Sequence, residues 1–327
     1  MRKVLITGIT GQDGSYLAED YLADGWEVHG VVRRSSTLVR PRIDHLFSPD
    51  KNSKNQNIKL HYGDLSDCSA LIRILDTVQP EHFVNLGAQS HVAISFEVPL
   101  ETGNVTGLGA ASVFEAVRIV NHNIKVYQAS SSEMFGGGEG QVFLNENSTF
   151  EPKSPYAAAK MYAHNMGKIY RESFGMHISN GILFNHESPR RGENFVSKKI
   201  TKAVAGISRG QQNKLFLGNI YATRDWGHAR DYMKAVRLML EAPKPDDYVV
   251  ATGVAHSVQQ FVELAFGMMN LDVNKYLEID EHLFRPNEVK DLLGDPSKIK
   301  EALGWEPTTS FEALVQEMLA SDLEDLK

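Results

Sequence analysis

Three glycines spaced three residues apart follow a short apolar run at the start of the chain. The run is Val4-Leu5-Ile6, the glycines are Gly8, Gly11 and Gly14, and a stretch typical of a helix follows from 15 to 22. Strand, glycine turn and helix in this order are what a dinucleotide-binding βαβ unit requires, because the backbone can then approach a pyrophosphate at the positive end of the helix. The alternative is an ordinary structural turn, since the chain has 26 glycines and spacing alone is a weak signal.

The next predicted strand, residues 27–32, ends in two arginines and two serines, Arg33-Arg34-Ser35-Ser36. An NAD site usually has an acidic residue about 20 residues beyond the glycines, where it binds the ribose 2′-hydroxyl. Arginine and hydroxyl side chains in that place favour the 2′-phosphate of NADP instead. The alternative is a solvated basic turn. The sequence therefore predicts NADP as the cofactor.

A tyrosine and a lysine, Tyr156 and Lys160, lie four residues apart in a predicted helix. Positions i and i+4 share one helix face, so the ammonium group can lie close to the phenol. A nearby positive charge lowers the pKa of a tyrosine, which would make Tyr156 a base near neutral pH. The alternative is a surface pair without chemistry.

Ser131 and Glu133 add a hydroxyl and a carboxyl group shortly before this pair. A simple alcohol dehydrogenase needs one acid/base group, so the carboxyl group of Glu133 indicates a second proton transfer. The hydroxyl of Ser131 can donate and accept a hydrogen bond. The alternatives are a capping serine and a helix-end acid.

The composition is typical of a soluble enzyme. At 327 residues, 42% of them hydrophobic, the chain can form a nucleotide domain with a substrate-binding addition. The net charge of −7 comes without a basic tract, which argues against a nucleic-acid partner. The single cysteine, Cys68, excludes an internal disulfide and a cysteine-rich metal site, and we expect no metal ion. We see no signal peptide and no membrane-spanning apolar run, so we expect a cytoplasmic protein.

Strands alternate with helical stretches through the first half of the chain, which predicts a Rossmann-type, doubly wound parallel sheet. The expected strands are residues 3–7, 27–32, 58–62, 82–86, 125–129 and 178–183. Residues 35–57 are polar and irregular and predict a long loop. Beyond about residue 185 the pattern is less regular, so we expect a nucleotide domain over 1–185 and a smaller, mixed α/β substrate domain over 186–327. A segment near 226–255 is expected to return to the first domain.

The longer motifs spread over nearly the whole chain. They read TGITGQDG (7–14), NLGAQSHV (85–92), YQASSSEMFG (127–136), SPYAAAK (154–160), LFNHESPRRG (183–192), GNIYATRDWGHARDY (218–232), ATGVAHSV (251–258) and FRPNEVKDLLGDP (284–296). Together they resemble the GDP-mannose 4,6-dehydratase family of the extended short-chain dehydrogenases/reductases. The glycine and Tyr-Lys motifs indicate only the large superfamily, whereas LFNHESPRRG and RDWGHARDY are typical of dehydratases of the GDP-mannose type.

The resemblance implies conversion of GDP-D-mannose to GDP-4-keto-6-deoxy-D-mannose by a hydro-lyase. Hydride passes from C4 of the sugar to NADP⁺ while Tyr156 takes the hydroxyl proton, and Lys160 lowers the pKa of the phenol and binds the nicotinamide ribose. Glu133 then removes the C5 proton and assists loss of the C6 hydroxyl as water, and hydride returns to C6. Ser131, where the family commonly has threonine, is the catalytic hydroxyl.

The resemblance also implies two binding sets. Cofactor binding is expected from Gly8, Thr10, Gly11, Gln12, Asp13, Gly14, Arg33, Arg34, Ser35, Asp64, Leu65, Leu86, Gly87, Ala88, Ser90, Tyr156, Lys160, Leu183, His186 and Arg191, with His186 as an oriented structural histidine rather than a base. Substrate binding is expected from Ser90, Ser131, Glu133, Asn185, Glu187, Val196, Lys199, Gly218, Arg224, Arg285 and Glu288. For Arg224 and Arg285 the alternative is surface salt bridging.

Other activities on the same fold stay open. A GDP-manno-heptose 4,6-dehydratase would need a change of one or two pocket side chains, and the chain departs from the family at Tyr221, often an acidic residue, and near Lys198, often arginine. A sugar-nucleotide epimerase or reductase would not need Glu133, and a non-catalytic NADP sensor would not need Tyr156 or Lys160. The loop 37–45, with Arg40 and Arg42, resembles a family segment that crosses to a neighbouring subunit, which implies a homotetramer.

Overall fold

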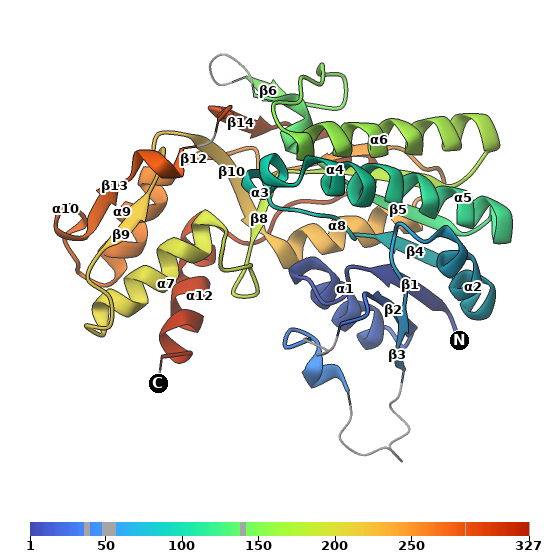
Figure 1. The fold of residues 1–327 in the computed structure, drawn as a ribbon, viewed down its shortest axis with the longest axis horizontal. Helices are drawn as coiled ribbons and strands as arrows, with labels where there is room; N and C mark the ends of the chain where they lie inside the picture. The colour runs from blue at the N-terminus through green and yellow to red at the C-terminus, as the bar shows by residue number, and fades with distance from the viewer. Residues whose placement is uncertain (36–39, 48–56, 138–141, 285, 327) are drawn as a thin grey trace.

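A seven-stranded parallel sheet forms the larger part of the molecule (Figure 1). The computed structural model describes residues 1–35, 40–47, 57–137, 142–284 and 286–326. In spatial order the strands are β11 (Asp247–Val250), β7 (Ile178–Leu183), β5 (Lys125–Ser131), β4 (His82–Asn85), β1 (Lys3–Thr7), β2 (Glu27–Val32) and β3 (Ile58–Tyr62). This order confirms the predicted doubly wound α/β class, in which ligands bind at the carboxyl ends of the strands.

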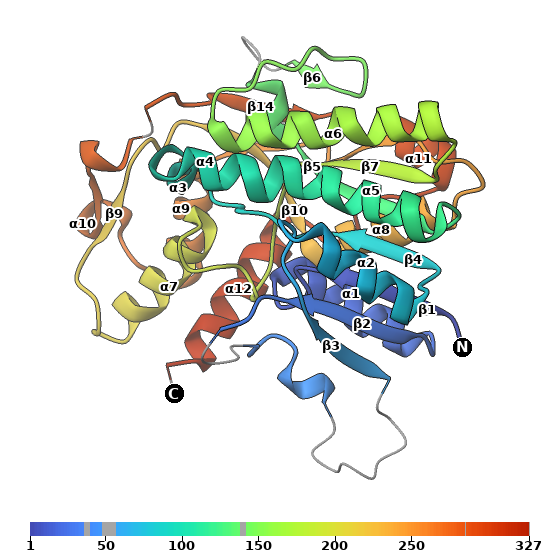
Figure 2. The same cartoon turned by 45° about the vertical axis from the view of Figure 1, so that its right-hand side comes forward.

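Helices cover both faces of this sheet (Figures 1 and 2). One face packs against α2 (Cys68–Val78), α5 (Gly109–Asn121) and α6 (Pro155–Phe174), and the other against α1 (Gln12–Ala23), α8 (Ala229–Glu241) and α11 (Ser297–Leu303). A strand covered on both sides is buried on both sides, which explains why Val4, Leu5 and Ile6 form an unbroken apolar run.

The ends of α6 show how the sequence defines the helix that carries Tyr156. The Ser154 hydroxyl oxygen accepts a hydrogen bond from the Ala157 amide at 3.1 Å, and Pro155 occupies the first helical position. Gly175, at the other end, adopts the left-handed conformation with φ of 66°. These caps place Tyr156 in the first turn of α6.

A smaller region lies beyond the carboxyl ends of the large sheet. Its strands are β6 (Phe143–Leu144), β8 (Asn185–Glu187), β9 (Leu215–Leu217), β10 (Thr223–His228), β12 (Ala255–Ser257), β13 (Leu277–Ile279) and β14 (Asp291–Gly294). Helices α7 (Val196–Ser208), α9 (Val258–Met268) and α12 (Phe311–Glu324) share a separate apolar core. Short helical elements complete the described chain: η1 (Asp44–Leu46), α3 (Val92–Glu97), α4 (Pro99–Thr102), η2 (Gly103–Leu108), η3 (Ser132–Phe135), α10 (Val273–Tyr276) and η4 (Glu281–Leu283).

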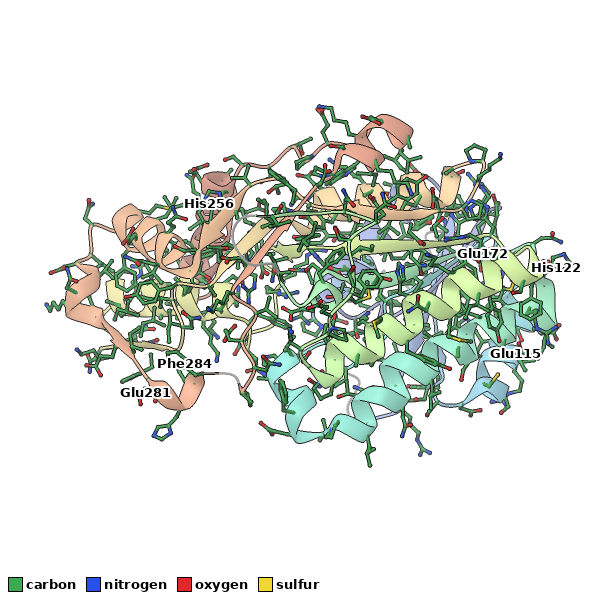
Figure 3. The ribbon with its side chains drawn as sticks, turned by 90° about the horizontal axis from the view of Figure 1, so that it is seen from above. Glu115, His122, Glu172, His256, Glu281 and Phe284 are labelled. Atoms are coloured by element: carbon green, nitrogen blue, oxygen red, sulfur yellow. The ribbon has the colours of Figure 1, made fainter. Side chains whose placement is uncertain are left out.

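The two regions are interleaved along the chain. Helix α8 and strand β11 follow β10 of the smaller region, yet β11 is the edge strand of the large sheet, beside β7. Seen from above, Glu281 and Phe284 of the smaller region lie at the opposite end of the molecule from Glu115 on α5, His122 just after α5 and Glu172 on α6 (Figure 3). The domain boundary at residue 185 stays a prediction.

Four of the six expected strands have the predicted bounds, and two differ slightly. β4 ends at Asn85 rather than 86, and β5 continues to Ser131 rather than 129. The helix expected from residue 15 begins at Gln12. Gly14 is therefore part of the first helical turn. It can pack on the Gly8 backbone there because it has no Cβ. Within the polar segment 35–57, the described part includes one short helix, η1.

Candidate active site

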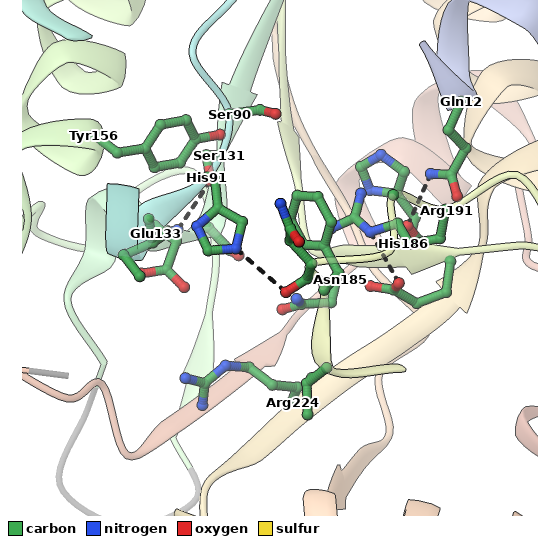
Figure 4. A pocket seen from close by; sticks show the side chains of 18 of the residues that line it. Gln12, Ser90, His91, Ser131, Glu133, Tyr156, Asn185, His186, Arg191 and Arg224 are labelled. Carbon is green, nitrogen blue, oxygen red and sulfur yellow. Dashed lines mark hydrogen bonds and ion pairs between the residues drawn. The ribbon is translucent and has the colours of Figure 1, made fainter. Parts of the chain in front are cut away.

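A cavity of about 800 Å³ opens where β1, β4, β5 and β7 end against the smaller region (Figure 4). Most of the predicted site residues line it together: Gly8, Gly11, Gln12, Asp13, Gly14, Leu86, Ala88, Ser90, Ser131, Glu133, Tyr156, Lys160, Leu183, Asn185, His186, Glu187, Arg191, Val196, Lys199, Gly218, Arg224 and Glu288. The two binding sets inferred from the sequence thus meet in one space.

The glycine turn forms one wall of this cavity with bare backbone. Gly8 has φ of 72°, and its carbonyl accepts a hydrogen bond from the Gly11 amide at 2.9 Å. A Cβ on Gly14 would lie 2.4 Å from the Gly8 carbonyl oxygen, so the turn closes only with glycine there. Gly11 is the N-cap of α1 and has no side chain to cap it. The wall is therefore shaped to receive a pyrophosphate at a helix N-terminus.

Tyr156 and Lys160 are both buried, but the lysine does not act on the phenol as predicted. Lys160 Nζ donates a hydrogen bond to the carbonyl oxygen of Ala129 at 2.7 Å and lies 5.8 Å from the Tyr156 ring centroid. Burial lowers the pKa of Lys160 to about 8. Burial also raises the pKa of Tyr156 to about 12; a hydrogen bond with Ser131 lowers it and the charge of Glu133 raises it. The prediction of a low phenol pKa set by Lys160 is wrong for this structure, because the ammonium group is directed to the end of β5.

Ser131 and Glu133 lie where β5 passes into η3, beside Tyr156. The Ser131 hydroxyl oxygen accepts a hydrogen bond from the Glu133 amide at 3.3 Å, so Ser131 caps this turn as well as contacting the phenol. The Glu133 side chain is 9% exposed and lines the cavity. The carboxyl group of Glu133 thus lies buried at the cavity beside the phenol, and its role in proton transfer stays a prediction.

The smaller region supplies a second wall, rich in charge. Arg224 Nη1 donates hydrogen bonds to the carbonyl oxygens of Thr223 at 2.8 Å and Lys290 at 3.1 Å, and Arg224 Nη2 lies 3.4 Å from Glu288 Oε1. A Cβ on Gly218 would lie 2.8 Å from the Leu283 carbonyl oxygen. Arg285, predicted to act with Glu288, lies outside the described residues.

The carboxylate of Glu187 is already bonded to neighbouring side chains of its own chain. Its carboxylate accepts a short hydrogen bond from the Ser197 hydroxyl and lies 3.0 Å from Arg191 Nε. The Arg191 guanidinium in turn covers the Phe195 ring at 3.6 Å. The carboxylate thus orients Arg191 at the cavity wall, and its predicted role in substrate binding stays a prediction.

Arg33, Arg34 and Asp64 line a separate, shallower hollow of about 410 Å³ at the carboxyl ends of β2 and β3. Arg73 of α2 adds a third arginine there. Hydrogen bonds from Ser66 lower the pKa of Asp64, and the charge of Arg33 adds to this. The hollow therefore combines an anionic hydrogen-bond acceptor with several cations.

Four predicted residues, Thr10, Ser35, Leu65 and Gly87, line neither space among the residues that the structure describes. A Cβ on Gly87 would lie 2.8 Å from the Leu65 side chain, so these two residues pack on each other beneath the cavity. The Thr10 carbonyl oxygen accepts a long hydrogen bond, 3.5 Å, from Arg42. Their roles in cofactor binding stay predictions.

Comparison with known proteins shows similarity over nearly the whole chain. A family model described as GDP-mannose 4,6 dehydratase matches residues 5–318. The chain belongs to this family. GDP-mannose 4,6 dehydratase 1 of Arabidopsis thaliana is 53% identical over 330 residues, which cover 99% of this chain and 90% of the relative. The human GDP-mannose 4,6 dehydratase is 46% identical, covering 98% and 91%.

Solved structures share the fold of this GDP-mannose 4,6-dehydratase family member. A UDP-glucose 4-epimerase from Thermotoga maritima, with UDP-glucose, superposes with a TM-score of 0.86 at 23% identity and covers 99% of this chain and all of its own. DesIV, a dTDP-glucose 4,6-dehydratase from Streptomyces venezuelae with NAD and TYD bound, gives 0.86 at 21% identity, covering 99% and 97%. At these identities the likeness shows the fold alone.

Side chains outside the two predicted binding sets, among them His91 and Arg42, also line the cavity of this family member. His91 Nε2 lies 3.3 Å from the Asn194 carbonyl oxygen across the cavity, and its ring packs near Phe195. Arg42 Nε donates a hydrogen bond to the Arg190 carbonyl oxygen at 2.7 Å. His91 stands inside the NLGAQSHV motif, and Asn194 and Phe195 stand two and three residues after LFNHESPRRG, so proximity to motifs was the available signal.

Two further findings bear on predictions made from the sequence. Tyr221 is 75% exposed, and neither it nor Lys198 is among the residues that line the cavity in the described chain. Neither departure from the family pattern therefore changes the described wall. No described cluster of three or more His, Cys, Asp or Glu side chains is arranged for a metal ion. No described helix is long and apolar enough to cross a membrane.

Proposed function

We propose that the chain is an NADP-dependent GDP-mannose 4,6-dehydratase that converts GDP-D-mannose to GDP-4-keto-6-deoxy-D-mannose. The observation that carries this proposal is the meeting of two proton-transfer groups, Tyr156 and Glu133, in one cavity with the glycine turn. Membership of the family and the names of the relatives support the substrate. An epimerase needs the tyrosine but has no use for the buried carboxyl group beside it.

The residues divide the reaction into two proton transfers. Bound NADP⁺ would accept hydride from C4 and return it to C6. Tyr156 takes the proton of the C4 hydroxyl as its phenolate. Burial raises the pKa of Tyr156 to about 12, and the hydrogen bond with Ser131 and the positive charge of bound NADP⁺ would lower it. The ketone at C4 acidifies C5, so Glu133 can remove that proton and then deliver one to the departing C6 hydroxyl, which leaves as water. Lys160, held at Ala129, is within reach of the nicotinamide ribose that the family places there. The proton that Tyr156 took from the C4 hydroxyl would then be returned to C5, which completes the product and regenerates the phenolate.

The glycine turn and the arginine hollow support NADP as the cofactor. The turn closes tightly only with glycine at position 14, where a Cβ would meet the Gly8 carbonyl oxygen, and this leaves the bare N-terminus of α1 at the cavity for a pyrophosphate. Arg33 and Arg34 stand at the hollow beyond β2, where a 2′-phosphate would lie. Asp64 in the same hollow would bind the adenine.

We also expect a cytoplasmic homo-oligomer, a tetramer by analogy with the family. Exposed apolar side chains on α5 and α6 support association, among them Ile119, Ile169 and Phe174, each about half exposed. The described part of loop 37–45 contacts its own chain through Arg42, and residues 36–39 lie outside the description. Light scattering behind size exclusion would test the oligomeric state.

The test is mass spectrometry of the purified protein with NADP⁺ and, in parallel, GDP-mannose, GDP-manno-heptose and dTDP-glucose. Loss of one water from GDP-mannose without net NADPH is the expected result. Loss from the heptose alone would keep the mechanism and change the substrate. A change of stereochemistry or oxidation state without loss of water would overturn the proposal. Glu133→Gln is the matched control: it keeps the shape of the side chain and should bind NADP⁺ but lose nearly all dehydration.

A further inference from the structure

The first turn of α1 is hydrogen-bonded to strand β8 of the smaller region and to the residue that follows it (Figure 4). Gln12 Nε2 donates a hydrogen bond to the backbone carbonyl of His186 at 3.1 Å, and the Ser188 hydroxyl donates to Gln12 Oε1 at 2.8 Å. The His186 ring itself reaches Asp13, with Nε2 2.9 Å from Oδ2. Two segments more than 170 residues apart are thus joined beneath the glycine turn.

The partners of His186 determine how many protons its ring carries. Nδ1 lies 2.7 Å from the carbonyl oxygen of Phe184, which can only accept a hydrogen bond, and Nε2 faces the carboxylate of Asp13. Burial raises the pKa of Asp13, but the charge of His186 and hydrogen bonds from His186 and Gln12 outweigh it and hold the pKa at about 2. The carboxylate is therefore ionised and can only accept as well. Both ring nitrogens must then carry hydrogen, which makes the ring an imidazolium.

The position of Asp13 means that the positive charge of His186 affects anion binding at α1. Asp13 stands in the first turn of α1 and lines the cavity, where an anion is expected to meet the helix N-terminus. A carboxylate at that place would repel a pyrophosphate. We infer that His186 is a positioning residue that acts through Asp13: as a fixed imidazolium it cancels the carboxylate charge and holds the first turn of α1 for anion binding. The inference rests on the proposed dinucleotide site.

The other groups around the ring define the expected pH dependence. Arg191 opposes the charge on His186, and Tyr232 of α8 stacks on the ring with centroids 5.1 Å apart, its pKa raised by burial so that it stays neutral. Burial lowers the pKa of His186. The charge of Asp13 and its hydrogen bond raise that pKa by more, so the net pKa lies above the ordinary value of a histidine. The imidazolium is the form that both acceptor partners of the ring stabilise, and it is lost as pH rises, so affinity for an anionic cofactor should fall with rising pH. Lys160, which titrates at about pH 8, adds a separate fall.

The protonation state can be read without any ligand. Nitrogen NMR of ¹⁵N-histidine-labelled protein distinguishes an imidazolium from either neutral tautomer, and the signal of His186 is identified by its loss in His186→Gln. We expect both nitrogens to carry hydrogen at pH 7.5. A neutral tautomer at that pH would overturn the inference, whether or not the protein binds NADP⁺.

The action through Asp13 is tested by a double-mutant cycle on the dissociation constant of NADP⁺, measured by calorimetry from pH 7 to 9.5. In the natural background His186→Gln should weaken NADP⁺ binding roughly tenfold at pH 7, the size of one charge-assisted contact. The dissociation constant should then vary with pH only as far as the titration of Lys160 changes it. In the Asp13→Asn background the same change should have little effect, because no carboxylate is left to neutralise. An equal loss in both backgrounds would show that His186 acts on the cofactor directly. Absence of NADP⁺ binding by the unsubstituted protein would refute the dinucleotide site instead and leave the NMR result to decide the charge of His186.

Discussion

Lys160 shows at the scale of one residue that a functional group can lower stability. Its side chain is buried, and burial holds its pKa at about 8, below the usual 10.5. A lysine whose pKa is lowered by folding binds fewer protons in the folded than in the unfolded state between those values. Folding stability should therefore be lowest below about pH 8 and rise with pH toward 10.5.

Lys160→Met should remove this penalty while it abolishes activity. We expect the free energy of unfolding at pH 7 to rise by about 2 kcal/mol, because Met fills similar space without a buried charge. The gain over the natural protein should shrink between pH 8 and 10. Urea unfolding at several pH values measures it. Parallel pH profiles of the two proteins would contradict the effect of burial on Lys160.

Arg33 is the residue on which the choice between NADP and NAD depends in this account. It lines the hollow at the end of β2 together with Arg34 and Arg73. Arg33→Ala should weaken NADP⁺ by roughly tenfold or more, the loss of one charge-assisted contact with a phosphate, and leave NAD⁺ nearly unchanged. Calorimetric titration with both dinucleotides provides its own control. Equal losses for the two would remove Arg33 from 2′-phosphate recognition.

At the scale of the element, the junction of β1 and α1 depends on Gly14. A Cβ there would meet the Gly8 carbonyl oxygen at 2.4 Å and Ile9 Cα at 2.5 Å, and backbone atoms cannot move aside as a flexible side chain can. Gly14→Ala should cost about 1–3 kcal/mol of stability by overpacking and weaken NADP⁺ binding. Gly267→Ala in α9 is the matched control, since nothing lies within 4 Å of its added Cβ. It should gain up to about 1 kcal/mol. Similar results for both variants would refute the close approach.

The sequence predicted the elements of the large sheet better than those of the smaller region. β1, β2, β3 and β7 are short segments that contain at least two Val, Ile or Leu residues between turns, so local pattern indicates them. Strands such as β8 and β12 have three residues each, and they exist only because long-range pairing with β10 completes them. Local sequence carries little trace of such pairing.

Site residues could be predicted where their spacing in the sequence places them together. Contacts of side chains with backbone carbonyl oxygens could not be predicted. Ser131, Glu133, Tyr156 and Lys160 were found because one strand end and one helix face bring them together. The hydrogen bond of Lys160 with the Ala129 carbonyl oxygen was not predicted. Every residue has a carbonyl oxygen, and the sequence does not say which carbonyl oxygen is available to the lysine. Arg42 and His91 contact the backbone carbonyl oxygens of Arg190 and Asn194, in the loop after β8. These contacts could not be predicted for the same reason.

At the scale of the whole molecule, a buried ion pair joins the C-terminal helix to the cavity wall. Lys198 Nζ of α7 lies 2.6 Å from Asp322 Oδ1 of α12, with both side chains at least nine-tenths buried, and donates to the Pro189 carbonyl oxygen at 2.9 Å. Pro189 precedes the arginines of the LFNHESPRRG motif. The end of the chain thus supports a loop of the site.

Lys198→Ala should cost about 3 kcal/mol or more, because it leaves Asp322 buried and unpaired. The matched control is Lys202→Ala on the same helix, whose partner Glu193 is exposed and which should change stability by less than about 1 kcal/mol. Denaturant unfolding of the two variants tests the contrast. Equal small losses would show that the C-terminal helix does not support the loop through this pair.

The central claim is that hydride leaves C4 and returns to C6 of the same sugar while Tyr156 and Glu133 move the protons. The most direct measurement is NMR and mass analysis of the product formed from GDP-mannose deuterated at C4, with unlabelled NADP⁺. We expect loss of one water, deuterium at C6 of the product and no lasting deuterium in the cofactor pool. Deuterium absent from C6, or accumulated in the reduced cofactor, would contradict it.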